Sequence, residues 1–187
     1  MKLYIIRHGE SETNKKGCWT GWLDAPLTDK GINDAKRVRA VLGNVKFDKV
    51  FSSDLSRATL TAKTALPNCE YETTPLLREI GLGLLEGKNS SSLTDELRES
   101  FKDGYSSVGG ESVAEFRERI ESFLKLVENS DYKNVAAFSH GGFLTSALSV
   151  VFGVDISRKH LRCANCATLI LDYTDGIWRV EGWINLP

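Results

Sequence analysis

The chain lacks an excess of charge of either sign, and it lacks any long apolar run. Its 187 residues include 24 Lys and Arg against 25 Asp and Glu, a balance that argues against a nucleic-acid or acidic-membrane partner. The longest apolar stretches are far too short to span a bilayer. The first ten residues, MKLYIIRHGE, lack the longer apolar region and small-residue cleavage site of a signal peptide. We therefore expect a soluble cytoplasmic protein that binds neither nucleic acid nor membrane.

Cysteine is also sparse, with four residues in the chain, and only Cys163 and Cys166 form a close pair. A structural zinc site would need a second pair, and Cys18 and Cys69 stand alone. A thioredoxin-like motif should open a helix, whereas ATLILDY after this pair is typical of a strand. We expect reduced, structural cysteines, and the role of the Cys163/Cys166 pair stays open.

Internal repeats, low-complexity tracts and proline-rich linkers are missing as well, so no domain boundary is visible. A chain of this length suits one domain that buries about 70% of its unfolded surface. We expect a single domain over residues 1–187.

Strand-like and helix-like segments alternate along the chain. Buried strands are predicted at 4–6, 49–53 and 134–139 from their apolar β-formers. Helices are predicted at 28–43, 55–66, 112–129 and 143–153, the third opened by a capping box of Ser112 and Glu115. Residues 166–183 read as two strands joined at Asp175-Gly176. The pattern predicts a three-layer α/β fold: a mostly parallel central sheet with helices on both faces and one antiparallel strand near the C-terminus.

Cationic-capable side chains follow three of the predicted strands. Arg7 and His8 end the first, Arg57 lies in the first turn of the helix after the second, and His140 follows the third. Ligands of open α/β sheets bind beyond the carboxyl ends of the strands, so these four side chains should converge there. Arginine offers a planar fork matched to phosphate oxygens, and the helix N-termini add oriented N–H groups. The sequence therefore predicts a phosphate site.

The same residues suggest phosphoryl transfer. A neutral imidazole is a good nucleophile, and three neighbouring cationic groups would keep His8 neutral by lowering its pKa. The leaving oxygen needs a proton, and residues 76–87 offer Glu79 and Glu86 as donors, although an isolated glutamate is more often a solvated surface residue. A metal-dependent hydrolase built on His8 and His140 is disfavoured, because no HExxH spacing is present and two arginines oppose a cation.

Five motifs, in order along the chain, resemble the histidine phosphatase superfamily, whose fold is also called phosphoglycerate-mutase-like. They are RHGESETN, TGWLDAPLTDKG, SSDLSRATLTA, LREIGLGLLEG and SHGG, and NCATLILDY fits the terminal strand region of the family. RHG alone would be weak support; five ordered motifs over nearly the whole chain are strong support.

The resemblance implies roles for matching residues. His8 would be the nucleophile that becomes phosphorylated, and Glu79 would protonate the leaving group and then activate water. The rest of the phosphate pocket would be Arg7, Arg57 and His140, and the substrate-binding positions would be Asn14, Thr20, Gly21 and Gly141. Leu84-Leu85 depart from the family pattern, because many of its phosphatases carry Trp or Tyr there. No cofactor or metal is implied.

Hydrolysis is favoured over mutase chemistry. Cofactor-dependent mutases of the family carry a large insertion after the acid motif, whereas only about thirty residues separate Glu79 from GGES here. We expect a small lid insertion around 84–111, with 91–104 as one short amphipathic helix. WTGWLDAPL is mild support for a mutase.

The expected substrate is a small phosphorylated metabolite; a phosphoglycerate mutase-type transfer and a non-catalytic phosphate-binding module are the alternatives. Trp19 and Trp22 could wall the pocket or pack on the sheet, and the sequence leaves the oligomeric state unknown.

Overall fold

A mixed sheet organises the computed structural model, which describes residues 1–92, 94–156 and 161–186. Within these ranges the sheet has six strands in the order β3-β2-β4-β1-β5-β6. β1 pairs in parallel with β4, β4 with β2, and β2 with β3, whereas β5 runs antiparallel to both β1 and β6. The strands are β1 (Lys2–Arg7), β2 (Lys49–Ser52), β3 (Glu72–Thr73), β4 (Asn134–Ser139), β5 (Thr168–Thr174) and β6 (Ile177–Ile184). The predicted α/β sheet with one antiparallel strand is confirmed.

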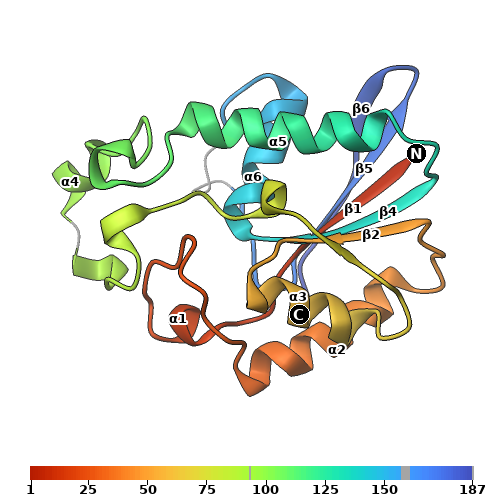
Figure 1. Ribbon diagram of the computed structural model, residues 1–187, viewed down its shortest axis with the longest axis horizontal. Helices are drawn as coiled ribbons and strands as arrows, with labels where there is room; N and C mark the ends of the chain where they lie inside the picture. Colours follow the sequence, from red (N-terminus) through yellow and green to blue (C-terminus); the bar gives the residue numbers. More distant parts are fainter. Residues whose placement is uncertain (93, 157–160, 187) are drawn as a thin grey trace.

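Helices cover both faces of this sheet, α5 and α6 on one and α2 and α3 on the other (Figure 1). The helices are α1 (Glu12–Lys15), α2 (Asp29–Leu42), α3 (Ser56–Ala65), α4 (Asp95–Glu99), α5 (Val113–Glu128) and α6 (Gly141–Phe152). The Thr28 side chain caps α2, and the predicted Ser112–Glu115 capping box opens α5. No helix of the described residues has the length and apolar character needed to cross a membrane.

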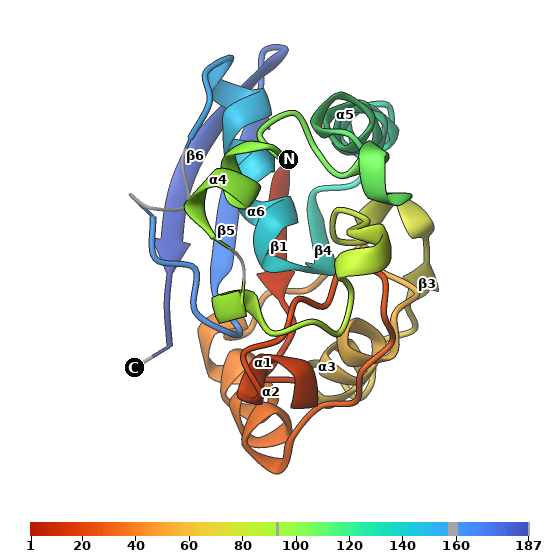
Figure 2. The ribbon, with the colours of Figure 1, turned by 90° about the vertical axis from the view of Figure 1, so that its left-hand side faces the viewer.

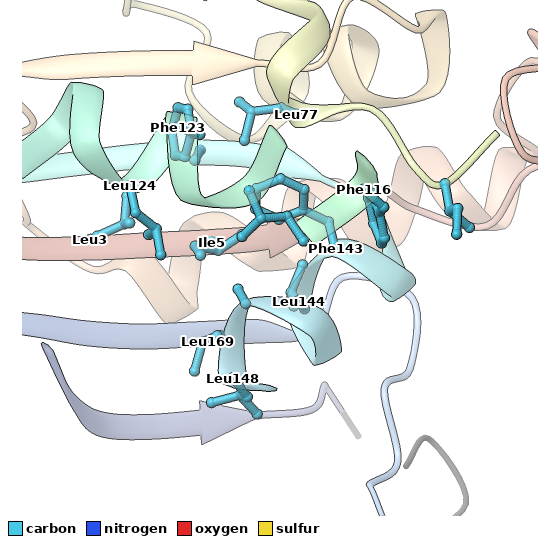
Figure 3. Packing of buried hydrophobic residues seen from close by; sticks show 14 of the residues in the cluster. Leu3, Ile5, Leu77, Phe116, Phe123, Leu124, Phe143, Leu144, Leu148 and Leu169 are labelled. Atoms are coloured by element: carbon cyan, nitrogen blue, oxygen red, sulfur yellow. The ribbon is translucent and has the colours of Figure 1, made fainter. Parts of the chain in front are cut away.

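Successive residues of β1 point into two separate cores. Ile5 packs with Phe123, Phe143 and other residues of α5, α6 and the sheet, as Figure 3 shows. Ile6 packs on the opposite face, with Val38 of α2 among its neighbours. Both isoleucines are fully buried, which explains why β1 is an unbroken apolar run instead of an alternating one. A central strand covered on both faces is therefore a rigid support for the residues that follow it.

The segment before α5 differs from its prediction. Residues 91–104 were expected to form one helix, but α4 spans only Asp95–Glu99 and follows a 3₁₀ turn at Ser90–Ser92. The Asn89 carboxamide accepts hydrogen bonds from both the main chain and the hydroxyl of Ser91, and such side chains compete with helical backbone bonds. Further 3₁₀ turns lie at Pro75–Leu77, Gly83–Leu85 and Ser106–Val108. His160, expected in a loop, lies outside the described residues.

The loop before β5 carries the CANC pair. Cys166 is buried with a positive φ of 60°, and burial raises the pKa of its thiol to about 12. A thiol with such a pKa is protonated near neutral pH, whereas a redox-active cysteine needs a lowered pKa. Cys166 is thus a packing residue of the core formed with α2 and α3.

Candidate active site

The carboxyl ends of β1 and β4 lie side by side and bring two histidines together. Arg7 of β1 is in register with Ser139 of β4, and the main-chain N–H of His8 donates to the Ser139 carbonyl at 2.9 Å. The imidazole rings of His8 and His140 then lie 5.1 Å apart between centroids. In Figure 2 this edge of the sheet faces the viewer, with α1 below it.

His8 is held in one tautomer by its own turn. Its Nδ1 lies 2.6 Å from the Gly9 carbonyl, and because a carbonyl only accepts, Nδ1 carries the proton. Nε2 therefore has a lone pair, to which Arg57 Nε donates at 3.2 Å. Burial, then the charges of Arg57 and Arg7, hold the pKa of His8 well below its usual value. The neutral, nucleophilic form is the form present at neutral pH.

One part of the predicted electrostatics is wrong. Three cationic neighbours were expected to lower the pKa of His8, but burial is the largest cause. His140 is not a cation either, because burial and the charge of Arg57 hold its own pKa well below the usual value. The site therefore contains two neutral imidazoles and two guanidinium groups.

Arg57 is fully buried in the first turn of α3. Its Nη2 donates to the Gly21 carbonyl at 2.7 Å and its Nη1 to the Leu23 carbonyl at 2.9 Å. Burial lowers the pKa of Arg57 to about 10, so the guanidinium still carries its charge at neutral pH. The turn that contains Gly21 is thus fastened to the same arginine that contacts the His8 ring.

Two buried nitrogens at this edge have no hydrogen-bond partner within the described part of the chain: Arg7 Nε and His140 Nδ1. Buried polar groups are rarely unsatisfied, so each of these nitrogens is a candidate donor to a bound anion. Arg7 Nη1 donates to the Cys163 carbonyl at 2.5 Å, which fixes its guanidinium. His140 Nε2 lies 2.9 Å from the Ser53 hydroxyl; when that hydroxyl donates, Nδ1 holds the proton and can donate to a phosphate oxygen. The residue types fit a phosphate group.

Glu79 presents its carboxylate to the same site. Its Oε2 accepts from the Gly142 N–H at 2.8 Å, at the N-terminus of α6, and its Oε1 accepts from the Ile80 N–H at 3.1 Å. The other predicted proton donor, Glu86, is used differently: its Oε1 accepts from the main-chain N–H groups of Trp22 and Leu82. Of the two glutamates, Glu79 is the one that lines the cavity described next.

A cavity of about 480 Å³ opens over the histidine edge. Seven of the nine predicted site residues line it: Arg7, His8, Asn14, Thr20, Gly21, Arg57 and Glu79. His140 and Gly141 do not; His140 lies fully buried beneath the surface, and Gly141 packs against Arg7, where a Cβ would sit 3.3 Å from Nε. Gly141 thus leaves room for Arg7 instead of lining the cavity. Among the described residues, no group of three or more His, Cys, Asp or Glu side chains could hold a metal ion.

Asn165 is a site-supporting residue that the sequence did not reveal. Its Nδ2 donates to the His8 carbonyl at 3.3 Å and to Asn14 Oδ1 at 3.1 Å. It therefore ties the loop before β5 to both the predicted nucleophile and the predicted phosphate-site asparagine. The predicted antiparallel strand was the available signal, because its N-terminal loop must return to the carboxyl edge of the parallel strands.

The two tryptophans left open by the sequence have different surroundings. Trp19 lines the cavity and makes an edge-on contact with Tyr105, with ring centroids 5.7 Å apart. The Trp22 indole instead donates to the main-chain carbonyl of Glu79 at 2.7 Å. The cavity also includes residues that were not predicted, among them Phe101, Lys102, Tyr105 and Ser146.

Fold and candidate site define an α/β protein that brings two histidines, two arginines and a glutamate together at the carboxyl edge of its parallel strands. The family model for the histidine phosphatase superfamily (branch 1) matches residues 3–186, and the chain belongs to this family. It is 32% identical to the probable phosphoglycerate mutase GpmB of Escherichia fergusonii, over 98% of this chain and 90% of that protein.

Solved structures show the same relationship. The crystal structure of TTHB049 from Thermus thermophilus superposes with a TM-score of 0.79 at 32% identity, covering 100% of both chains. A structure from Escherichia coli K-12, provisionally described as an alpha-ribazole-5'-P phosphatase, gives 0.82 at 29% identity and covers 97% of this chain and 94% of that one. Relatives of this chain are therefore named both as mutases and as phosphatases.

Proposed function

We propose that this protein hydrolyses the phosphomonoester of a small metabolite through a phosphohistidine at His8, without a metal ion. The observation that carries the proposal is the hydrogen bond from His8 Nδ1 to the Gly9 carbonyl. That bond leaves the Nε2 lone pair toward the buried Arg57, at the sheet edge where Arg7 Nε and His140 Nδ1 have no partner among the described residues. The guanidinium groups of Arg7 and Arg57 would neutralise the charge of the phosphate, a role that divalent ions have in other phosphoryl-transfer sites.

The first step transfers the phosphoryl group to the enzyme. Arg7, Arg57 and His140 bind the phosphate oxygens, and Arg57 Nε moves from His8 Nε2 to one of those oxygens. Nε2 then attacks phosphorus in line; the N–P bond forms and the bond from phosphorus to the ester oxygen breaks. Glu79 in its acid form gives its proton to that oxygen, and the alcohol leaves.

The second step returns the enzyme to its starting state. The Glu79 carboxylate takes a proton from a water molecule, the water oxygen bonds to phosphorus, and the N–P bond breaks. Inorganic phosphate leaves, His8 is neutral again, and Glu79 has regained its proton. One carboxyl group in the cavity thus serves both half-reactions.

Phosphoglycerate mutase-type transfer is the second candidate, because curated relatives are named probable phosphoglycerate mutases. The two functions share the first step and differ in the acceptor. Hydrolysis is favoured because only about thirty residues lie between Glu79 and Glu111, which leaves little chain to seal the cavity from water. Incubation with 3-phosphoglycerate and a bisphosphoglycerate primer, followed by product analysis, separates the two: a mutase yields 2-phosphoglycerate, and a hydrolase yields inorganic phosphate.

The test of the intermediate is a rapid quench during turnover of a ³²P-labelled phosphomonoester. We expect protein-bound label that survives base and is lost in mild acid, as a phosphoramidate is. His8→Ala should abolish the label, whereas His140→Ala should slow its formation and leave the attachment site unchanged. Label that persists in His8→Ala, or that is acid-stable, would contradict the proposal. Binding of phosphomonoesters without any turnover by the wild type would instead identify a binding module.

A further inference from the structure

The carbonyl of Gly9 determines which nitrogen of His8 carries the proton, so its position matters for the proposed attack. Gly9 is buried and packs against the first turn of α2, where a Cβ on Gly9 would sit 2.4 Å from the Gly31 carbonyl oxygen. Glycine fits this close approach, but it is also the residue with the greatest freedom to rotate its peptide groups. Neighbouring contacts must therefore hold the carbonyl in place.

Thr61 supplies the contact on the N-terminal side of Gly9. Thr61 is fully buried, on α3 and one turn after Arg57. Its hydroxyl donates to the Arg57 carbonyl at 2.6 Å, because a carbonyl can only accept. With the proton used in this way, Thr61 Oγ1 has a lone pair for the Gly9 N–H, which donates to it at 3.0 Å. One hydroxyl thus fastens the peptide group between His8 and Gly9 to α3.

A second contact holds the chain on the other side of Gly9. The Glu10 carbonyl accepts from the Thr28 N–H at 2.9 Å and from the Thr28 hydroxyl at 3.4 Å. The Gly9 carbonyl therefore lies between two anchored peptide groups. The shorter bond from Thr28 uses the main chain, which a change of side chain does not remove, whereas the bond to Thr61 depends on its hydroxyl.

The same turn of α3 thus acts on both nitrogens of the His8 ring. Arg57 Nε donates to His8 Nε2 at 3.2 Å, and Thr61, four positions later, acts on Nδ1 through Gly9. A reacting group has to be held within about 0.5 Å of its productive position, and a single helix provides that reference here. If the Gly9 carbonyl turned away, Nδ1 would lose its acceptor. The proton would then be free to occupy Nε2, where it blocks attack on phosphorus.

We propose that Thr61 is a positioning residue: through the Gly9 N–H, its hydroxyl holds His8 in the Nδ1-protonated tautomer that leaves Nε2 free to attack. The catalytic importance of this tautomer rests on the proposed function, but the tautomer itself can be measured without turnover. Thr61 does not line the cavity, so its effect on the reaction passes through Gly9 and His8.

Nitrogen-15 NMR of histidine-labelled protein measures the tautomer. The chain has three histidines, and His8→Gln identifies the signals of His8. At about pH 8, where the lowered pKa keeps this ring neutral, we expect wild-type His8 to be protonated at Nδ1. Thr61→Val keeps the shape of the side chain and removes the hydroxyl, so a second population protonated at Nε2 should appear. Thr61→Ser, which keeps the hydroxyl, should show the wild-type signals.

Kinetics with ethyl phosphate provide a second readout. Thr61→Val should lower kcat by about 10- to 100-fold and leave KM close to the wild-type value, because the arginines still bind the phosphate. Thr64→Val is the matched control: the Thr64 hydroxyl makes the same kind of bond on the same helix, to the Leu60 carbonyl at 2.7 Å. This control should leave both the tautomer and kcat unchanged. If Thr61→Val does not fold, Thr61→Ala, which also lacks the hydroxyl, takes its place.

Two results would overturn the role of Thr61. One is the same His8 tautomer in the wild type and in Thr61→Val. The other is a loss of kcat in Thr61→Ser as large as that in Thr61→Val, which would assign the effect to the methyl group. A changed tautomer in Thr61→Val, with a wild type that hydrolyses no phosphomonoester, would support the role of Thr61 and contradict the proposed function. An unchanged tautomer in an active hydrolase would do the reverse.

Discussion

The guanidinium of Arg119 donates to the main-chain carbonyl of Glu79, with Nη2 3.1 Å from the oxygen. The same group donates to the carbonyls of Leu76 and Arg78 and pairs through two nitrogens with the Glu111 carboxylate. Both side chains of this ion pair are nearly buried, at 14% and 10% exposure. Helix α5 thereby helps to hold the stretch of chain that carries the proposed acid, together with the Trp22 indole, which donates to the same Glu79 carbonyl.

Arg119→Met should therefore impair proton delivery more than phosphate binding. We expect kcat for ethyl phosphate to fall by about 10- to 100-fold, with a smaller loss on p-nitrophenyl phosphate, whose leaving group needs little protonation. Arg117→Met is the matched control, because Arg117 lies on the same helix and pairs only with exposed carboxylates in the described structure. A thermal melt is needed alongside, since breaking a buried pair costs about 3–5 kcal/mol. Equal losses on both substrates would mean that Arg119 supports the fold and not the acid.

Glu79→Gln removes the proposed acid while keeping its size. The kcat for an alkyl phosphate should drop by about 10²–10⁴, and the loss on p-nitrophenyl phosphate should be much smaller. Glu86→Gln is the comparison: its carboxylate accepts only main-chain N–H groups among the described contacts, so any loss it causes should be the same for both substrates. A leaving-group dependence found in Glu86→Gln instead of Glu79→Gln would assign the proton to Glu86.

The two buried histidines should make folding stability depend on pH. Their folded pKa values lie well below the usual 6.5, so between those values and about pH 6.5 the unfolded chain binds more protons. The free energy of unfolding should then be independent of these two histidines above about pH 6.5. Below that pH it should decrease, by at most about 1.4 kcal/mol per pH unit for each histidine. Urea titrations between pH 5 and 7 measure the slope, and His8→Gln should reduce it. An unchanged slope in that variant would show that His8 does not titrate differently on folding.

Gly21 should resist substitution more than another glycine with similar backbone angles. Its φ is +50°, and a Cβ there would collide with the Glu86 carboxylate and with Leu82. Gly17, at φ +65°, has nothing within 4 Å of the same position, so Gly17→Ala measures the backbone cost alone, about 1–2 kcal/mol. Gly21→Ala should cost more in urea unfolding and should also raise KM, because the Gly21 carbonyl orients Arg57. Equal costs for the two variants would mean that the Gly21 turn adjusts freely.

Chelation should leave turnover intact. If Arg7 and Arg57 supply the charge that Mg²⁺ supplies elsewhere, activity after EDTA treatment and gel filtration should equal that of the untreated enzyme. The hydrolysis of p-nitrophenyl phosphate provides the measurement. Loss of turnover that a divalent ion restores would contradict metal-independent catalysis.

The sequence predicted the elements with strong local signals. The apolar runs that became β1, β2 and β4 and the capping box of α5 depend on near neighbours only, so they could be recognised without the fold. β3 has two exposed residues, Glu72 and Thr73, and therefore no apolar pattern. Helix α1 is a single turn. It has a capping box of Ser11 and Asn14 but no apolar stripe. Short elements of this kind are stabilised by what lies around them.

Within the site, the position of a residue along the chain pointed to those that follow strand ends, and the family resemblance supplied the other predicted residues. Arg7, His8 and Arg57 were placed by the rule that parallel strands share one functional edge. Arg119 and Asn165 donate to main-chain carbonyls of residues that are distant in sequence. Every residue type has a main-chain carbonyl, so the identity of the accepting residue gives no signal in the sequence. The dominance of burial in the pKa of His8 was missed for a related reason, because desolvation depends on complete packing around the ring.

The return of β5 beside β1 has a consequence for how the protein is made. The bond from Asn165 to His8 spans 157 positions of the chain, and that from Arg7 to Cys163 spans 156. Synthesis proceeds from the N-terminus, so Arg7 and His8 leave the ribosome early. Their contacts with Cys163 and Asn165 can form only after more than 150 further residues have been added. Contacts so distant in sequence also form slowly. A nascent or truncated chain that ends before residue 163 would therefore carry His8 without the groups that hold it, and recovery of activity would report the final step of folding.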